Sequence, residues 1–284
     1  MSAPYEAMVR RVAPYTVAGF LWYQGEEDEA RAGSYRELLG LMIAEWRALW
    51  NLDAYPTPPL GYRPVTPPAL PFLLVQLPQW IDGQLAAAGG DPRHWPVIRA
   101  AQLDVAESLD DVSIISTMDC GEFDNIHPTD KRTVGVRLAE LALHDVYGDD
   151  GAAARSPRVA DVRANGDGHE LVVTFADADG LHWKGTTPDT QATAEASGPD
   201  EIELRLAGCS GFEVAPAARA DGDAPGDDGW VDANAQIMDD GAVRVWSDDV
   251  RDPARVRYAW RSWGPAPLFN AQGLPAFPFA SSTS

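Results

Sequence analysis

The sequence feature that most constrains the fold is an alternation of short apolar runs and amphipathic segments in the first half of the chain. The apolar runs are rich in β-branched and aromatic residues, so they predict buried strands at 17–23, 72–77 and 112–118. The neighbouring segments carry apolar residues on one helical face and predict helices at 4–13, 34–50, 95–109 and 129–147. Apolar strands that alternate with helices indicate a parallel sheet covered on both faces, and hence an α/β fold.

Local signals mark the ends of two of these helices and one interruption. Ser34 is expected to cap the helix at 34–50, with Glu37 as its capping-box partner. Gly148 is expected to end the helix at 129–147. The segment 56–71 contains seven prolines, which preclude a helix and favour extended backbone. We interpret this segment as an ordered surface loop, with a ligand for a proline-recognition module as the alternative.

The character of the chain changes near residue 149, where a linker rich in Gly, Asp and Ala begins. Beyond it, short alternating runs predict an antiparallel β segment, with strands at 170–175, 201–206, 243–247 and 255–260. The sequence therefore predicts an α/β domain at 1–148 and a β-rich accessory domain at 149–284. The tail from residue 278 is expected to be disordered.

The chain is strongly acidic, with 22 Lys and Arg against 43 Asp and Glu and a formal net charge of -21. Such a chain repels phosphate backbones and anionic lipid surfaces, so we expect neither nucleic acid nor membrane as a partner. We find no apolar run that predicts a membrane span and no signal peptide, and the compartment stays open. Cys120 and Cys209 lie far apart and lack the spacing of a disulfide framework or a zinc site.

Polar residues follow the predicted strands at 17–23 and 112–118. The first strand runs into Gln24 and Glu26, and the third is followed by Asp119, Asp124 and His127. Because the carboxyl ends of parallel strands meet at one edge of a sheet, we expect these five residues to share one neighbourhood.

Asp124 and His127 have the spacing of the acid and base of a hydrolase site, in which the acid fixes the imidazole tautomer. This spacing also arises by chance, and Pro128 can simply begin the following helix. Gln24 can donate an amide N–H to an oxyanion, or it can be a satisfied residue at a turn. The acids that start at Glu26 can form a metal patch, but adjacent side chains point apart, which favours a solvated turn.

Several longer segments, taken in order, resemble the second half of sialate O-acetylesterases, which are serine esterases of the SGNH hydrolase superfamily. They are "GFLWYQGEEDE", "PFLLVQLP", "WPVIRAAQ", "DNIHPTDKRTVGVRLAELAL", "VRYAW" and "LFNAQGLPAFPF". The resemblance spans about residues 4–279. It implies a three-layer α/β/α flavodoxin-like core and hydrolysis of O-acetyl esters of sugars such as sialic acid, without a metal or organic cofactor.

The resemblance also implies roles for individual residues. His127 would be the general base, Asp124 its orienting acid and Gln24 the side-chain oxyanion donor. Glu26 and Arg99 match motif positions near the site, and we expect Glu26 to bind or position the substrate. Arg99, with Gln102, belongs to an Arg-x-x-Gln motif, which implies either substrate binding or a structural role near the site. This chain departs from the family where Glu27 follows the Gln-Gly-Glu motif, because Ser or Thr is common there.

The nucleophilic serine of the family lies in a Gly-Gln-Ser-Asn-Met block upstream of the first of these segments. None of Ser34, Ser108, Ser113, Ser116 and Ser210 stands in such a block or at a strand-to-helix turn. We therefore expect the core to be incomplete at its N-terminal side, without the strand and helix that carry the serine. The alternatives are a non-catalytic carbohydrate-binding remnant and a subunit that takes its nucleophile from another chain.

Overall fold

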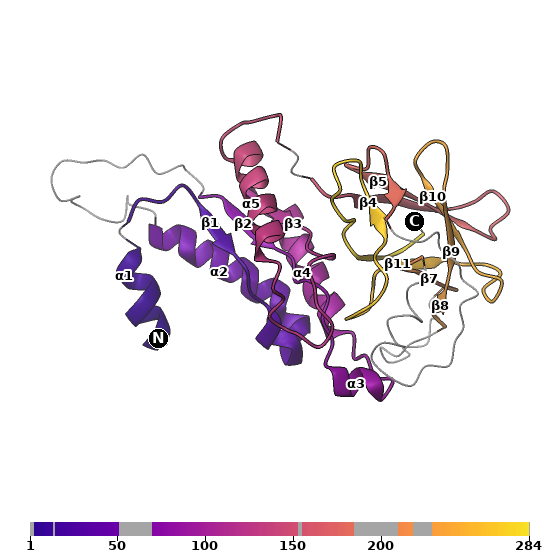
Figure 1. The fold of residues 1–284 in the computed structure, drawn as a ribbon, viewed down its shortest axis with the longest axis horizontal. Coiled ribbons are helices and arrows are strands. Elements are labelled where there is room, and N and C mark those ends of the chain that lie inside the picture. Colours follow the sequence, from indigo (N-terminus) through magenta and orange to yellow (C-terminus); the bar gives the residue numbers. More distant parts are fainter. Residues whose placement is uncertain are drawn as a thin grey trace.

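The computed structural model describes residues 3–13, 15–50, 70–152, 155–184, 210–217 and 229–283. Figure 1 shows two parts side by side, which we call the α/β half (residues 3–148) and the β half (residues 155–283). The α/β half contains a parallel sheet of three strands in the order β1–β2–β3. These strands are β1 (Phe20–Trp22), β2 (Phe72–Val75) and β3 (Val112–Ile115).

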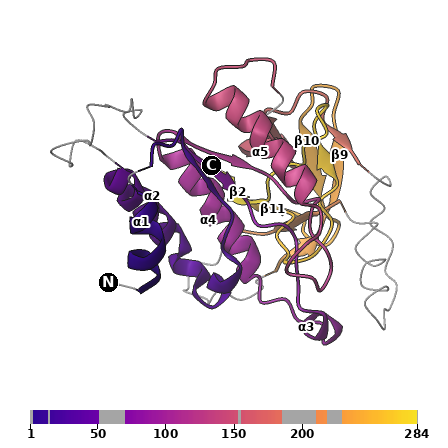
Figure 2. The same ribbon diagram turned by 60° about the vertical axis from the view of Figure 1, so that its left-hand side comes forward.

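Helices cover both faces of this sheet, because the central strand is apolar on both sides. Phe72 and Leu74 of β2 belong to a core shared with α2 (Tyr35–Trp50) and α4 (His94–Ser108). Leu73 and Val75 point to the other face and pack with α5 (Lys131–Asp145). Figure 2 shows the two groups of helices on opposite sides of β2. The expectation of a parallel sheet between helices is confirmed, and each predicted strand and helix of this half has a counterpart in the structure.

Shorter helical segments complete the α/β half, and they correct one prediction. They are a π-helix η1 (Tyr5–Val9), α1 (Arg10–Val12), a 3₁₀-helix η2 (Glu26–Ser34) and α3 (Gly83–Ala87). The predicted N-cap at Ser34 is wrong, because η2 already leads into α2 and the Ser34 hydroxyl donates to the Arg31 carbonyl at 3.0 Å. The prediction for Gly148 is confirmed, since it has φ 74° and its N–H donates to the His144 carbonyl at 3.2 Å.

The β half consists mainly of two four-stranded antiparallel sheets. The first has the order β4–β5–β10–β9, with β4 (Arg158–Ala164), β5 (Leu171–Ala176), β10 (Val243–Trp246) and β9 (Asn234–Ile237). The second has the order β13–β11–β7–β8, with β13 (Phe279–Ser282), β11 (Arg255–Tyr258), β7 (Phe212–Ala215) and β8 (Val231–Asp232). A short pair joins β12 (Leu268–Phe269) to β6 (His182–Trp183). Val173, Val245, Val214 and Val256 from both sheets share one core.

The end of the chain differs from its prediction. Residues 279–282, expected to be disordered, form β13 and pair with β11. Phe279 drives this pairing, since it is buried and its ring lies 6.3 Å from those of Phe212 and Tyr258. The predicted strand at 201–206, most of the proline-rich segment 56–71 and Cys209 lie outside the described residues.

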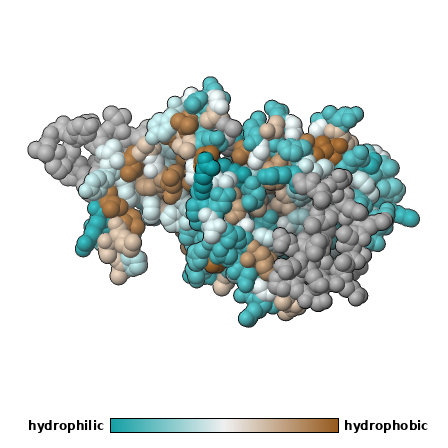
Figure 3. Space-filling model, in the orientation of Figure 1, coloured by the Kyte–Doolittle hydropathy of each residue, from teal (hydrophilic) through white to brown (hydrophobic). Residues whose placement is uncertain are grey.

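Exposed apolar side chains are concentrated at the N-terminal end of the α/β half. Of the eleven large apolar side chains that are exposed in the described residues, six are Met8, Val12, Tyr15, Leu21, Leu38 and Leu41. Figure 3 shows hydrophobic patches over this end of the molecule, at the left of the view. None of the helices described is both long and apolar enough to cross a membrane.

Candidate active site

The first candidate residues follow β1, where the chain turns tightly against α4. Gly25 has φ 147°, and a Cβ atom there would lie 3.1 Å from Leu77 Cδ1 and 3.2 Å from Ile98 Cγ2. Glycine is therefore needed both for the backbone conformation and for the close approach. This turn fixes the direction in which Gln24 and Glu26 leave the strand.

Gln24 is held by several hydrogen bonds. The Tyr35 hydroxyl donates to the Gln24 carbonyl at 2.8 Å and to its Oε1 at 3.2 Å, and Gln102 Nε2 also donates to the carbonyl, at 3.0 Å. Gln24 Nε2 donates to Asp28 Oδ2 at 2.7 Å. Burial raises the pKa of Tyr35 to about 12, which keeps its hydroxyl a donor at neutral pH. The Gln24 amide is thus fixed in orientation, with one of its two N–H bonds used by Asp28.

Glu26 lies at the start of η2 beside Tyr23. It is half-buried, and burial together with the Glu26 charge raises the pKa of Tyr23 to about 12. The Lys131 ammonium lies 4.9 Å from the centre of the Tyr23 ring. Lys131 begins α5, so the residues that follow β1 adjoin the segment that follows β3.

The segment that follows β3 is closed into a loop by Glu122. Its carboxylate accepts hydrogen bonds from the Thr129 N–H at 2.7 Å, the Thr129 hydroxyl at 2.5 Å and Asn125 Nδ2 at 2.6 Å. These bonds hold the pKa of Glu122 below its usual value. Sequence reasoning missed Glu122. The sequence did contain a signal, because the polar Asn125 and Thr129 that follow Glu122 in a loop can donate hydrogen bonds to its carboxylate.

Asp124 and His127 both lie in this loop, which we call the 122–129 loop, and both side chains are exposed. Asp124 has φ 57°, and its Oδ1 accepts a hydrogen bond from the Gly83 N–H at 2.7 Å. The hydrogen bond shown for His127 runs from its backbone N–H to Asn125 Oδ1 at 3.1 Å. The structure therefore brings the two candidates into one loop, but in the part of the chain that it describes no hydrogen bond joins their side chains.

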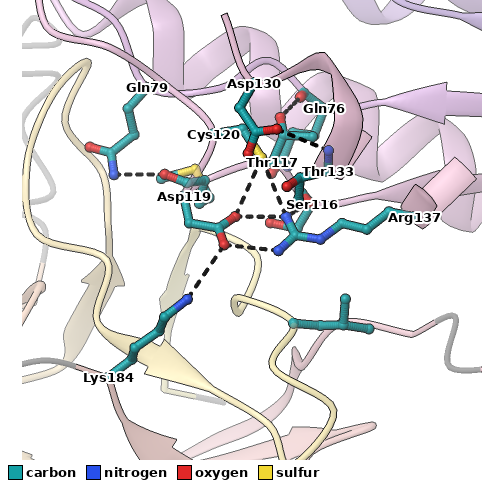
Figure 4. Close-up of polar contacts among 12 residues, drawn as sticks. Gln76, Gln79, Ser116, Thr117, Asp119, Cys120, Asp130, Thr133, Arg137 and Lys184 are labelled. Carbon is teal, nitrogen blue, oxygen red and sulfur yellow. Dashed lines mark hydrogen bonds and ion pairs between the residues drawn. The ribbon is translucent and has the colours of Figure 1, made fainter. Parts of the chain in front are cut away.

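Asp119, the other acid expected near the site, is used in a partly buried ion pair. Arg137 binds it with two hydrogen bonds of 2.6 and 2.8 Å and also donates to the Ser116 carbonyl at 2.9 Å. Figure 4 shows Lys184 approaching the same carboxylate, with its Nζ 3.8 Å from Asp119 Oδ2. Burial raises the pKa of neighbouring Cys120 to about 12, so its thiol stays protonated. We infer that this cluster is structural.

Arg99 is buried, which favours the structural role for this residue over substrate binding. Its side chain has 0% exposure, so no substrate can reach it in this conformation. The guanidinium donates to the carbonyls of Arg261 at 2.9 Å, Ser262 at 2.8 Å and Pro78 at 3.3 Å. Burial lowers the pKa of Arg99 to about 9, and Asp91 opposes that shift. Arg99 therefore fastens the β half to the α/β half.

The serines considered as nucleophiles are engaged elsewhere or are inaccessible. The hydroxyls of Ser34, Ser108 and Ser210 donate to backbone carbonyls, and that of Ser113 donates to Asp145. Ser116 has 0% exposure. None of these five offers a hydroxyl to His127. Among the described residues, no group of three or more His, Cys, Asp or Glu side chains is arranged to hold a metal ion.

The fold combines a parallel sheet between helices with antiparallel sheets, which is consistent with the α/β esterase of known structure to which it is similar. The chain is similar to the crystal structure of a carbohydrate acetylesterase from Xanthomonas citri, with a TM-score of 0.70 and 29% sequence identity. The similarity covers 98% of this chain and 53% of that chain, so this chain spans about half the length of its structural relative. No protein-family model and no curated protein sequence matches the chain.

Proposed function

We propose that this chain is part of a carbohydrate O-acetylesterase of the SGNH type, which removes acetyl groups from sugars. The observation that carries the proposal is the similarity to a carbohydrate acetylesterase over 98% of the chain. The ordered motifs of the sequence support it. They resemble those of an esterase family with an α/β fold, and one of them contains Asp124 and His127. Sialic acid is the first sugar to test, since the resembling family is named for it.

The proposed chemistry is acyl transfer to a serine followed by hydrolysis. The serine oxygen attacks the acetyl carbonyl while His127 takes its proton, and Gln24 donates its remaining amide N–H to the oxyanion. His127 then gives the proton to the departing sugar oxygen, which leaves an acetyl-serine. Water, deprotonated by His127, releases acetate and restores the serine. Asp124 would orient the imidazole by rotating one carboxylate oxygen toward it while the other keeps the Gly83 N–H.

The serine would come from a segment that packs beside β1. In the described residues β1 pairs with β2 alone, and Leu21 of β1 is 65% exposed. The exposed apolar side chains at the same end of the molecule, Met8, Val12, Tyr15, Leu38 and Leu41, offer a surface that such a segment would bury. A parallel strand at this edge would bring its carboxyl end next to Gln24.

The test compares acetate release from O-acetylated sugars by this chain and by a longer polypeptide that includes the serine block. We expect release only from the longer polypeptide, and we expect His127→Ala to abolish it. Burst release of p-nitrophenol from p-nitrophenyl acetate by this chain itself would show that its nucleophile lies within it. Undiminished activity of the His127→Ala variant would remove His127 from the mechanism. Sugar binding without acetate release from either polypeptide would favour the non-catalytic alternative.

A further inference from the structure

A tryptophan of the β half lies next to the loop that carries Asp124 and His127. The ring of Trp263 packs edge-to-face on Phe123, with the centroids 5.7 Å apart and the planes at 78°. Phe123 directly precedes Asp124, and Trp263 is only partly buried. The β half therefore brings an accessible aromatic ring against the residue that adjoins the candidate catalytic acid.

The chain on both sides of Trp263 is fixed to the α/β half. On one side, the N–H and the hydroxyl of Ser262 donate to the two oxygens of Asp91, at 2.9 and 2.6 Å. On the other side, the Gly264 N–H donates to Gln79 Oε1 at 2.7 Å. The position of the indole is thus set by its neighbours in sequence. A ring held in this way loses little conformational freedom when a ligand binds.

A small hollow of about 40 Å³ lies beside the same segment. Its lining includes Trp80, Asp82, Leu85 and Ser262, together with Glu29 from η2. This volume admits a substituent of a sugar but not a whole ring, and a sugar hydroxyl there can donate to the carboxylates of the lining. Asp82 also starts α3, whose first residue, Gly83, binds Asp124. The lining of the hollow therefore comes within one residue of Gly83, the hydrogen-bond partner of Asp124, and within one residue of Trp263 at Ser262.

We propose that Trp263 is a sugar-binding platform of this site. One indole face stacks on the C–H face of a pyranose ring, and the acetyl group of that sugar reaches toward the 122–129 loop. Indole supplies a large apolar face with a negative quadrupole, which attracts the weakly positive C–H groups of the sugar. The inference rests on the proposed function for the identity of the ligand and adds a sugar-binding residue from the β half.

Binding to this chain can be measured directly, without turnover. The probes are O-acetylated sialic acid and its deacetylated form, and the dissociation constant is measured by isothermal titration calorimetry with saturation-transfer NMR. We expect Trp263→Ala to weaken binding of both probes about tenfold, which corresponds to about 1.4 kcal/mol. Trp263→Phe should restore part of the affinity. Both probes are affected because the ring, not the acetyl group, contacts the indole.

Trp246→Ala is the matched control, because Trp246 is also partly buried but lies on β10 with its ring against Arg244. This variant should bind as the wild type does. If Trp263→Ala lowers the melting temperature but leaves the dissociation constants unchanged, Trp263 only stabilises the contact between the two halves, and the inference is overturned. Absence of binding by the wild type also overturns it. The proposed function fails on a different result, the absence of acetate release by the polypeptide with the serine block.

Discussion

The backbone N–H of Gly83 and the carboxylate of Asp124 meet at 2.7 Å, across 41 residues of sequence. A Cβ atom on Gly83 would lie 2.8 Å from Asp124 Cγ and from its Oδ2, a distance that carbon atoms do not tolerate. Gly83 therefore makes room for the candidate acid and also supplies its hydrogen-bond donor. The contact holds the 122–129 loop against the start of α3.

Gly83→Ala tests this contact. We expect the added methyl group to push the Asp124 carboxylate away and to lower kcat for acetate release at least tenfold, with a smaller effect on KM, measured in the polypeptide that carries the serine. Gly135→Ala on α5 is the control, because a Cβ there meets nothing within 4 Å and alanine favours the helix by about 1 kcal/mol. Equal kinetics in the two variants would show that the Gly83 contact has no part in catalysis.

The Glu122 carboxylate should make the 122–129 loop sensitive to acid. Its hydrogen bonds lower its pKa in the folded state, so the stabilisation is fully present above the ordinary pKa of a glutamate and is lost as the pH falls through the lowered value. We expect amide hydrogen exchange at Thr129 and Asn125 to accelerate over that acidic range. Glu122→Gln should show fast exchange already at neutral pH. Slow exchange in this variant at all pH values would contradict the prediction.

Arg99→Met should loosen the connection between the two halves. The substitution leaves the buried carbonyls of Pro78, Arg261 and Ser262 without this donor, so we expect a loss of about 3 kcal/mol in the free energy of unfolding. Urea denaturation measures it. Arg36→Met is the control, because Arg36 pairs with Asp104 at the surface and should cost less than about 1 kcal/mol. Similar losses in both variants would show that Arg99 is not a structural anchor.

Tyr35→Phe should disturb the orientation of Gln24 without removing it. The phenol donates to both the carbonyl and Oε1 of Gln24, while the carbonyl keeps its bond from Gln102. We expect kcat for acetate release to fall about tenfold, which is a loss of about 1.4 kcal/mol of transition-state stabilisation, with little change in KM. The exposed Tyr147 provides the control variant Tyr147→Phe, which should behave as the wild type. A change in KM alone would argue against an oxyanion role for Gln24.

The parts of the fold that follow from local periodicity could be predicted from sequence. The apolar run of β2 and the helical stripe of α2 are examples, because each residue there packs according to its own position in a strand or helix. Ser34 was misassigned because the acidic segment before it is itself helical, and an N-cap requires a non-helical residue at that point. Phe279 was missed as a strand residue because its partners Phe212 and Tyr258 lie far away in sequence.

In the candidate site, too, local sequence patterns predicted some features, while others depend on residues far apart in the sequence. The motif around Asp124 and His127 places both residues in one loop, but nothing in its residues indicates that the Asp124 carboxylate binds a backbone N–H from the start of α3. Likewise, Arg99 matches a motif position, yet its burial under Arg261 and Ser262 depends on how two distant parts of the chain pack. Contacts of this kind arise only from the tertiary structure.

The attachment of the segment around Ser262 to Arg99, Asp91 and Gln79 has a consequence for engineering this protein. The linker near residue 149 is an obvious place to truncate the gene. A polypeptide that ends there would expose Arg99, Asp91 and Gln79 to water, because the segment that binds them would be missing. Replacing the β half with an unrelated module would do the same. A chimera should therefore retain the four residues 261–264 in a backbone conformation that still lets them bind the α/β half.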